Sequence, residues 1–230
     1  YATRPPGAYA EARVMPAEAL VKLPDSISFE MAAAMMLQGL TVQYLFHRTF
    51  PLKGGETILF HAAAGGVGLI ACQWAHALER MVFISSELAG LVWCFVGEPE
   101  ITSKRQRTIV IGKGVPVVHA SIGKDTFIGS LDCLSPLGTM VSYGAASGPV
   151  PPFSLNELAS RGSLFITRPT LFAYTAKRSD LEAMAADLFR MVESGKVKIE
   201  INQRYALSDV QQAHRDLEAR KTTGSTILLP

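Results

Sequence analysis

The chain has 230 residues, of which 48% are apolar and 18% are charged, a composition typical of a globular protein with one or two domains. Its formal net charge of +2 is too small to indicate nucleic acid or an acidic membrane surface as a partner. The cysteines Cys72, Cys94 and Cys133 are odd in number and far apart, which excludes a disulfide framework and suits a reducing compartment. The longest apolar run, residues 88–96, is too short to cross a bilayer. We therefore expect a cytoplasmic protein without membrane contact.

The segments before residue 50 predict a short strand and a helix. Residues 7–14 alternate enough between apolar and polar side chains to predict a strand. Residues 25–37 begin with turn formers and continue as a strong helix, for which Ser28 is a suitable N-cap. We expect Gly39 to interrupt this helix before residues 40–46 resume it.

A small-residue turn between a strand and a helix is the feature around which the chain is organised. Residues 57–61 form a short apolar run that predicts a buried strand, and an amphipathic helix follows the turn. The pattern Ala63-x-Gly65-x-x-Gly68 is the dinucleotide-binding fingerprint with Ala in place of the first Gly. Such a turn lets the backbone approach a pyrophosphate at a helix N-terminus. An ordinary tight turn with no ligand is the alternative interpretation.

The second strand of such a fold is predicted over residues 80–86. Its end reads the adenosine ribose, where an acidic residue suits a free 2′-hydroxyl and Ser, Lys or Arg suits a 2′-phosphate. The chain offers Ser85 and Ser86 followed by Glu87, which is a mixed signal. The basic run at residues 103–107 is interpreted as a solvated loop, because no aromatic partners accompany it.

Regular structure is predicted again from residue 115. Residues 115–123 read as a strand and its turn, residues 124–134 as a helix, and residues 139–143 as another strand. Ligands in open α/β sheets bind beyond the carboxyl ends of the strands. Residues 119–121 and 143–146 are therefore candidate cofactor-lining segments, with ordinary strand-to-loop turns as the alternative.

The remaining elements complete an α/β pattern. Ser179 and Ser208 each begin a sequence typical of a capping box, and each is expected to start a helix. The first of these helices is expected to end at Gly195. The strands predicted in this part of the chain are residues 163–170, 197–206 and 226–229. This alternation of strands and helices predicts an α/β fold with a parallel sheet.

Several separate segments resemble one protein family in the same order. Residues 60–75 resemble the nucleotide-binding turn of the zinc-free quinone oxidoreductases, the zeta-crystallin-like branch of the medium-chain dehydrogenase/reductase superfamily. The other segments that are similar to this branch are residues 39–44, 131–134, 141–144, 166–171 and 223–230.

The resemblance implies an NADPH-dependent quinone reductase, in which a hydride passes directly from nicotinamide to quinone without a metal. It implies a Rossmann-type doubly wound sheet inserted in a partial GroES-like catalytic domain, usually in a homodimer. Residues 1–36 would be a remnant of the catalytic domain, 37–170 the dinucleotide-binding domain and 171–230 the return to the catalytic domain. The sequence also lacks a Cys-x-x-Cys motif or a His/Cys cluster that would indicate zinc.

The resemblance also implies which residues contact the cofactor. Gly66 and Val67 would offer backbone N–H groups to the pyrophosphate, and Arg168 and Arg220 would be charge partners or loop anchors. No side chain is an obvious catalytic acid or base. The remaining implied contacts are Tyr44, Ser121, Tyr143, Gly144, Ala145, Ala146, Pro169 and Thr170.

Three departures from the family pattern affect these expectations. The chain begins inside the pattern, so most of the N-terminal catalytic lobe is missing. Residues 79–114 do not match it, and Leu91 or a neighbour stands in place of the family's Lys that pairs with the 2′-phosphate. Ala145 stands where the family usually has Asn. A preference for NADPH over NADH is therefore the weakest part of the inference.

Two other functions stay open from the sequence. One is a catalytically silent nucleotide-binding or structural relative, which turnover with a quinone would exclude. The other is an enoyl or alkenal reductase on the same fold, which differs only in its substrate.

Overall fold

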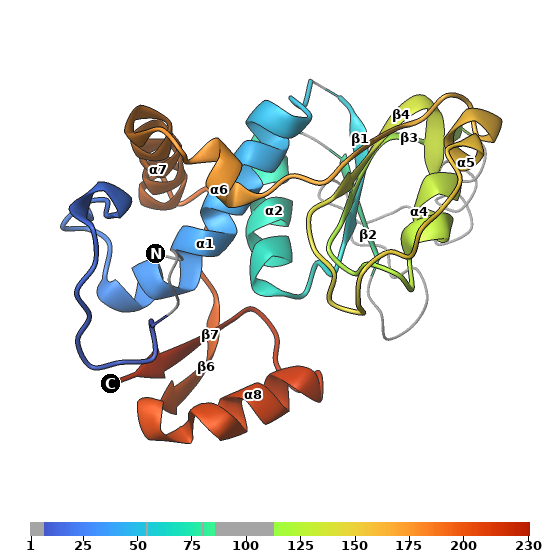
Figure 1. Ribbon diagram of the computed structural model, residues 1–230. Helices are drawn as coiled ribbons and strands as arrows, with labels where there is room; N and C mark the ends of the chain where they lie inside the picture. Colours follow the sequence, from blue (N-terminus) through green and yellow to red (C-terminus); the bar gives the residue numbers. More distant parts are fainter. Residues whose placement is uncertain (1–6, 54, 80, 86–112) are drawn as a thin grey trace, which may run out of the picture. The chain divides into compact units, whose positions relative to one another are not determined.

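The computed structural model describes residues 7–53, 55–79, 81–85 and 113–230, with residues 81–85 described by their backbone (Figure 1). The sequence predictions for Ser86, Glu87, Leu91 and the basic run at 103–107 lie outside the described residues. The chain forms two compact units. The first comprises Tyr1–Tyr44, Ala64–Trp74 and Leu171–Pro230, and the second comprises Leu45–Ala63 and Ala75–Thr170.

The second unit is built on a five-stranded sheet in the order β2-β1-β3-β4-β5, with every neighbouring pair parallel. This confirms the predicted α/β fold with a parallel sheet. Central parallel strands are covered on both faces and read as continuous apolar runs, which is why β1 was recognisable in the sequence. The strands are β1 (Thr57–His61), β2 (Met81–Ser85), β3 (Val115–Ala120), β4 (Leu134–Ser142) and β5 (Phe165–Thr167).

One hydrophobic cluster of this unit lies between the sheet and α4 (Phe127–Asp132), which packs on β3 and β4. Leu59, Val118 and Leu131 are fully buried there. The helix is shorter than the predicted 124–134, because Leu134 already pairs with Val115 as the first residue of β4. The second unit also contains the π-helical turn η2 (Leu45–Thr49) and the short helix α5 (Asn156–Ser160).

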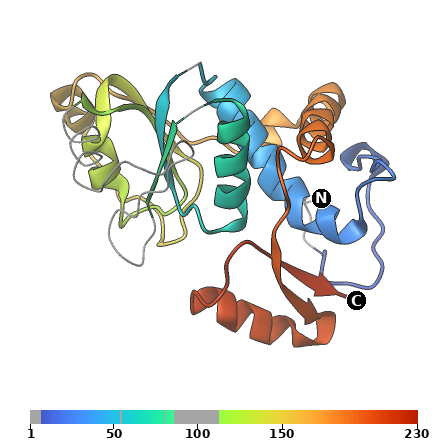
Figure 2. The same cartoon turned by 180° about the vertical axis from the view of Figure 1, so that it is seen from behind.

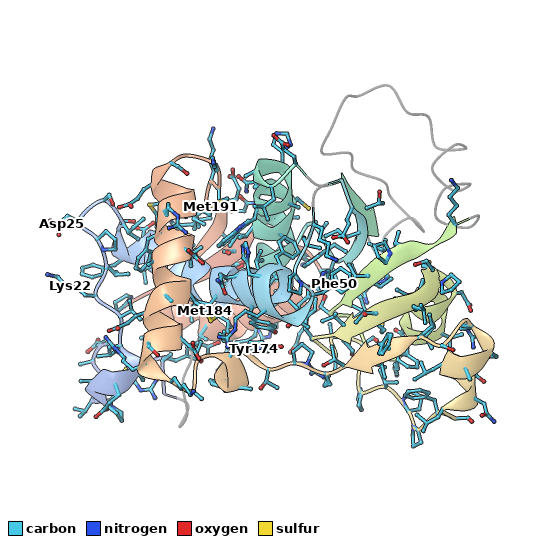
Figure 3. The ribbon with its side chains drawn as sticks, turned by 90° about the horizontal axis from the view of Figure 1, so that it is seen from above. Lys22, Asp25, Phe50, Tyr174, Met184 and Met191 are labelled. Atoms are coloured by element: carbon cyan, nitrogen blue, oxygen red, sulfur yellow. The ribbon has the colours of Figure 1, made fainter. Side chains whose placement is uncertain are left out.

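Three helices form one side of the first unit: α1 (Phe29–Tyr44), α6 (Leu171–Tyr174) and α7 (Arg178–Glu193). The Ser28 hydroxyl accepts a hydrogen bond from the backbone N–H of Met31 at 3.2 Å, which confirms the predicted N-cap. The prediction that Gly39 interrupts α1 is wrong, since the helix runs through it. A Cβ at Gly39 would lie 2.4 Å from Leu188 Cδ1, so Gly39 is the point where α7 packs closely on α1. Met184, labelled on α7 in Figure 3, is 2% exposed.

The other part of the first unit is a two-stranded parallel sheet with a helix beside it (Figure 2). Its elements are β6 (Ile201–Ala206), η3 (Leu207–Asp209), α8 (Val210–Glu218) and β7 (Ser225–Leu229). Strand β7 also contacts α1. Helix α2 (Gly66–Ala77) begins in this unit, and the unit boundary after Trp74 divides it.

Three local predictions are wrong. Residues 7–14 contain no strand; the chain there is irregular and leads to the 3-10 turn η1 (Ala17–Ala19). Neither predicted capping box forms, since no side chain caps α7 or α8. Helix α7 begins at Arg178, before Ser179, because the carbonyl of Lys177 accepts the first helical hydrogen bond, from the N–H of Leu181 at 3.1 Å. Among the described residues, no helix is both long enough and apolar enough to cross a membrane.

Candidate functional site

The fingerprint turn has the geometry that the sequence predicts. Strand β1 ends at His61, Ala62 follows in a left-handed conformation with φ of 57°, and α2 begins at Gly66. The first N–H groups of a helix have no acceptor within that helix. The N–H of Leu69 donates the first helical hydrogen bond to the carbonyl of Gly65, at 2.9 Å. This bond fixes the start of the helix. The N–H groups of Gly66, Val67 and Gly68 therefore have no acceptor within α2.

The C-terminal strand lies directly against this turn, within the first unit. Gly65 pairs with Gly224 in a parallel bridge, and the N–H of Gly224 donates to the carbonyl of Ala64 at 2.8 Å. A Cβ at Gly66 would lie 2.8 Å from the Ser225 hydroxyl oxygen. No local pattern in the sequence indicates a role for Gly224 or Ser225, because no spacing rule links the C-terminal strand to a turn so far away in the chain.

Gln38 also lies at the turn, and the sequence did not predict it. The side chain of Gln38 on α1 packs there, with its Cγ 3.3 Å from the position of a Gly66 Cβ. Its Oε1 is buried and has no hydrogen-bond partner among the described residues. A buried amide oxygen without a partner is costly. The backbone donors at the start of α2, not this oxygen, are the groups whose chemistry suits a pyrophosphate.

The other predicted contacts of the first unit are Tyr44 and Arg220. Tyr44 is 2% exposed, and its ring stacks on Tyr174 with the centroids 4.4 Å apart. Arg220 is exposed beyond the end of α8 and has a φ of 57°. Its N–H donates to the carbonyl of Leu217 at 3.1 Å.

In the second unit, the ends of β3 and β4 bring two predicted segments together. The N–H of Tyr143 donates to Ala120, and the N–H of Ala146 donates to the carbonyl of Ser121 at 3.0 Å. A Cβ at Gly144 would lie 2.6 Å from the Ser121 carbonyl oxygen, so only glycine fits there without a shift of the backbone. Residues 143–146 are thus held against Ser121 at the carboxyl edge of the sheet, where open α/β sheets bind ligands.

The predicted residues after β5 lie at the same edge. Arg168 is exposed and donates to the carbonyl of Pro169 at 3.3 Å; Pro169 is buried and Thr170 is exposed. A cavity of about 770 Å³ opens beside them. Its lining includes Gly144, Ala145 and Arg168, and it is mostly apolar. The other lining residues are Phe127, Ser142, Pro149, Val150, Pro151, Pro152, Phe153, Leu155, Ile166 and Thr167.

Two histidines of the second unit lie in its core. His61 bonds to the Ser130 hydroxyl at 2.9 Å, and burial lowers its pKa to about 4. His119 is fully buried beside the rings of Phe46 and Phe60, and burial lowers its pKa to about 3. Neither ring nitrogen of His119 has a hydrogen-bond partner among the described residues. Both side chains are therefore neutral at pH 7.

Ser85 is the last residue of β2 and pairs with His61, so β2 ends beside β1 at the carboxyl edge of the sheet. Within the described part of the chain, no group of three or more His, Cys, Asp or Glu side chains is arranged to hold a metal ion.

Comparison with known proteins gives consistent results. The family model described as "Zinc-binding dehydrogenase" matches residues 97–228, and the match begins inside the segment 79–114 that carries the predicted departures. The chain is 52% identical to the quinone oxidoreductase of Pseudomonas aeruginosa and 43% identical to quinone oxidoreductase 1 of Escherichia coli. These alignments cover 100% of the chain and 74% of each relative.

Solved structures agree with these relatives. The quinone oxidoreductase of Pseudomonas syringae superposes with a TM-score of 0.89 at 48% identity, over 100% of this chain and 74% of that one. The Escherichia coli quinone oxidoreductase, solved in complex with NADPH, superposes with a TM-score of 0.88 at 42% identity, over 96% of this chain and 72% of that one. With this identity over most of each relative's length, the chain belongs to the quinone oxidoreductase family of the medium-chain dehydrogenase/reductase superfamily.

Proposed function

We propose that this chain is an NADPH-dependent oxidoreductase that reduces quinones. The observation that carries the proposal is the turn at residues 65–68, where the backbone N–H groups at the start of α2 have no acceptor within the helix and suit a pyrophosphate. The family supports it, since one relative at 42% identity was solved with NADPH bound. The cofactor would supply a hydride directly to the quinone, and the chain's own residues would bind and orient both molecules.

Each of the two units contributes its own set of proposed cofactor contacts. In the first unit, Gly66 and Val67 would donate N–H groups to the pyrophosphate. The other contacts proposed for this unit are Gly65, Gly68, Tyr44 and Arg220. The second unit would contribute Ser121, residues 143–146 and residues 168–170, which follow β3, β4 and β5 in turn. We propose residues 1–36 and 171–230 as parts of the catalytic domain and 37–170 as the dinucleotide-binding domain.

We propose that the 2′-phosphate is recognised beyond the end of β2, where the sequence continues from Ser85 into Ser86. The missing Lys of the family pattern would have added a charged hydrogen bond of about 1.5–3 kcal/mol. Its absence lowers the expected preference for NADPH over NADH about ten- to a hundredfold.

A specific observation supports a second substrate class. The 2-haloacrylate reductase of Burkholderia is 40% identical over 98% of this chain, and the solved structure of a 2-haloacrylate reductase superposes with a TM-score of 0.85. A 2-haloacrylate carries an activated carbon–carbon double bond, which such a reductase reduces. An enone or acrylate reductase is therefore the alternative function, and a silent nucleotide-binding relative is the second alternative.

We also propose a homodimer that acts without zinc in the cytoplasm. Strand β5 is an edge strand of the sheet, and its Phe165 and Ile166 are 59% and 36% exposed. An exposed apolar edge favours pairing with a second copy. The widely spaced cysteines support a reducing compartment. A sedimentation-velocity experiment that gives only monomer at micromolar concentration would contradict the dimer.

Steady-state kinetics test the function. The chain, dialysed against a chelator, is assayed for NADPH oxidation with 1,4-benzoquinone and, in parallel, with 2-chloroacrylate. Turnover with the quinone supports the proposal, and turnover with the acrylate alone supports the second substrate class. NADPH binding without turnover of either substrate supports the silent relative. Loss of activity on chelation, with recovery on addition of Zn²⁺, would contradict metal independence.

A further inference from the structure

The nucleotide-binding turn has a back wall formed by the start of β7. A Cβ at Gly66 would lie 2.8 Å from Ser225 Oγ, 3.3 Å from Gln38 Cγ and 3.4 Å from the Gly224 carbonyl oxygen. A real Cβ essentially never approaches another atom closer than 3.0 Å. The direction of this Cβ is therefore toward the C-terminal strand and α1, which fill the space behind the turn.

Ser225 is held in place by its own hydrogen bonds. It is 4% exposed, its hydroxyl donates to the carbonyl of Ala34 on α1 at 2.9 Å, and its N–H donates to the carbonyl of Glu200 at 3.0 Å. If a side chain at position 66 pushed the hydroxyl aside, the buried bond to Ala34 would break. Because these hydrogen bonds hold the hydroxyl in place, it cannot rotate away to make room for a side chain at position 66.

Gly224 contacts the turn from the same side and holds its backbone in place. Its N–H donates to the carbonyl of Ala64, and it pairs with Gly65. It has a φ of +62°, and a Cβ there would lie 2.9 Å from both Asn202 Nδ2 and the Glu200 carbonyl oxygen. Only glycine fits this conformation and this space without strain.

We propose that Ser225 is a positioning residue for the cofactor. Its hydroxyl and the adjacent Gly224 pack behind the turn and hold the N–H groups at the start of α2 where they can bind the pyrophosphate. Gly66 is then a glycine because Ser225 lies behind it, and the approach of the cofactor does not itself exclude a Cβ. The inference rests on the proposed NADPH binding and adds the element that orients it.

The two explanations of Gly66 give opposite results in a double-mutant cycle. We expect Gly66→Ala to weaken NADPH binding about tenfold or more, because the new Cβ must displace the turn or the hydroxyl. Ser225→Ala removes the oxygen that the Cβ would meet. The double variant Gly66→Ala/Ser225→Ala should therefore bind NADPH within about twofold of Ser225→Ala alone, a coupling expected only between residues in contact.

A kinetic readout separates positioning from stability. Ser225→Ala should raise the KM for NADPH about threefold by loosening the wall, while kcat and the KM for 1,4-benzoquinone stay unchanged. Ser130→Ala is the matched control, because Ser130 is also a buried serine whose hydroxyl donates to a backbone carbonyl, that of Thr126 at 2.7 Å. This control should lose stability and keep the wild-type KM for NADPH.

The outcomes are distinguishable. A double variant that binds NADPH as weakly as Gly66→Ala, while the wild type binds normally, overturns the inference and assigns Gly66 to close approach of the cofactor. An unchanged KM for NADPH in Ser225→Ala also overturns it, and this variant remains informative if Gly66→Ala fails to fold. A wild-type chain that binds no NADPH overturns the proposed function, and the inference falls with it.

Discussion

The contact between Gly144 and Ser121 gives a prediction whose size follows from the structure. A Cβ at Gly144 would lie 2.6 Å from the Ser121 carbonyl oxygen and 2.8 Å from its Cα, which are backbone atoms and cannot rotate away. Overpacking of this kind costs about 1–3 kcal/mol. Replacing Gly by Ala returns about 0.4–1 kcal/mol by restricting the unfolded chain. The midpoints of these two ranges give a net destabilisation of about 1.3 kcal/mol for Gly144→Ala, with about 2.6 kcal/mol as the upper bound.

Gly129 provides the matched control for this substitution. It lies within α4 of the same unit, and a Cβ there would meet no heavy atom within 4 Å. Gly129→Ala should stabilise the chain by about 0.5–1 kcal/mol, because Ala favours a helix over Gly. The two identical substitutions are thus expected to act in opposite directions.

Differential scanning calorimetry measures both variants. For a chain of this length each kcal/mol shifts the melting temperature by about 2–4 °C. We expect Gly144→Ala to lower it by about 3–5 °C and Gly129→Ala to raise it by about 1–4 °C. If Gly144→Ala melts at or above the wild-type temperature, the contact with Ser121 does not constrain residues 143–146, and the reasoning is refuted.

Two further predictions concern charge. Burial lowers the pKa of His119 to about 3, below the value of about 6.5 in an unfolded chain; as pH falls below 6.5 the unfolded chain therefore takes up a proton that the folded chain does not. This histidine should cost about 1.4 kcal/mol of stability per pH unit between pH 6.5 and 4. Urea titrations at several pH values give the unfolding free energy as a function of pH. His119→Phe should make that dependence shallower, and an unchanged dependence would show that another group is responsible. Arg168→Gln should weaken NADPH binding by about tenfold at most, because the arginine is exposed and its interactions are screened. Arg161→Gln, which loses an ion pair with Asp132, is the control and should bind as the wild type does; equal losses in both would argue against a direct role of Arg168.

The sequence was most informative where local pattern and tertiary environment agree. Residues 57–61 are apolar because β1 is a central parallel strand, so the predicted and observed bounds coincide. The sequence was misleading where a contact with a residue far away in the chain determines the local structure. Gly39 reads as a helix breaker, but close packing against Leu188 favours the absence of a side chain there. Ser179 reads as an N-cap, but it lies inside the helix, which begins at Arg178 with Lys177 as its N-cap residue.

The site shows the same division. The turn at residues 65–68 could be predicted, because the spacing of its small residues is local. The wall behind it could not, because Gly224 and Ser225 reach the turn only through the parallel pairing of β7 with β6 and through the contact with α1. The unpaired Gln38 oxygen likewise has no signal in the sequence, since it depends on what packs around α1.

The central claim, that this chain binds NADPH, is tested most directly by fluorescence titration of the purified chain with NADPH and with NADH. We expect a dissociation constant for NADPH on the order of micromolar and weaker binding of NADH. If neither nucleotide binds, the turn is a remnant of the family fold and the proposed function is contradicted.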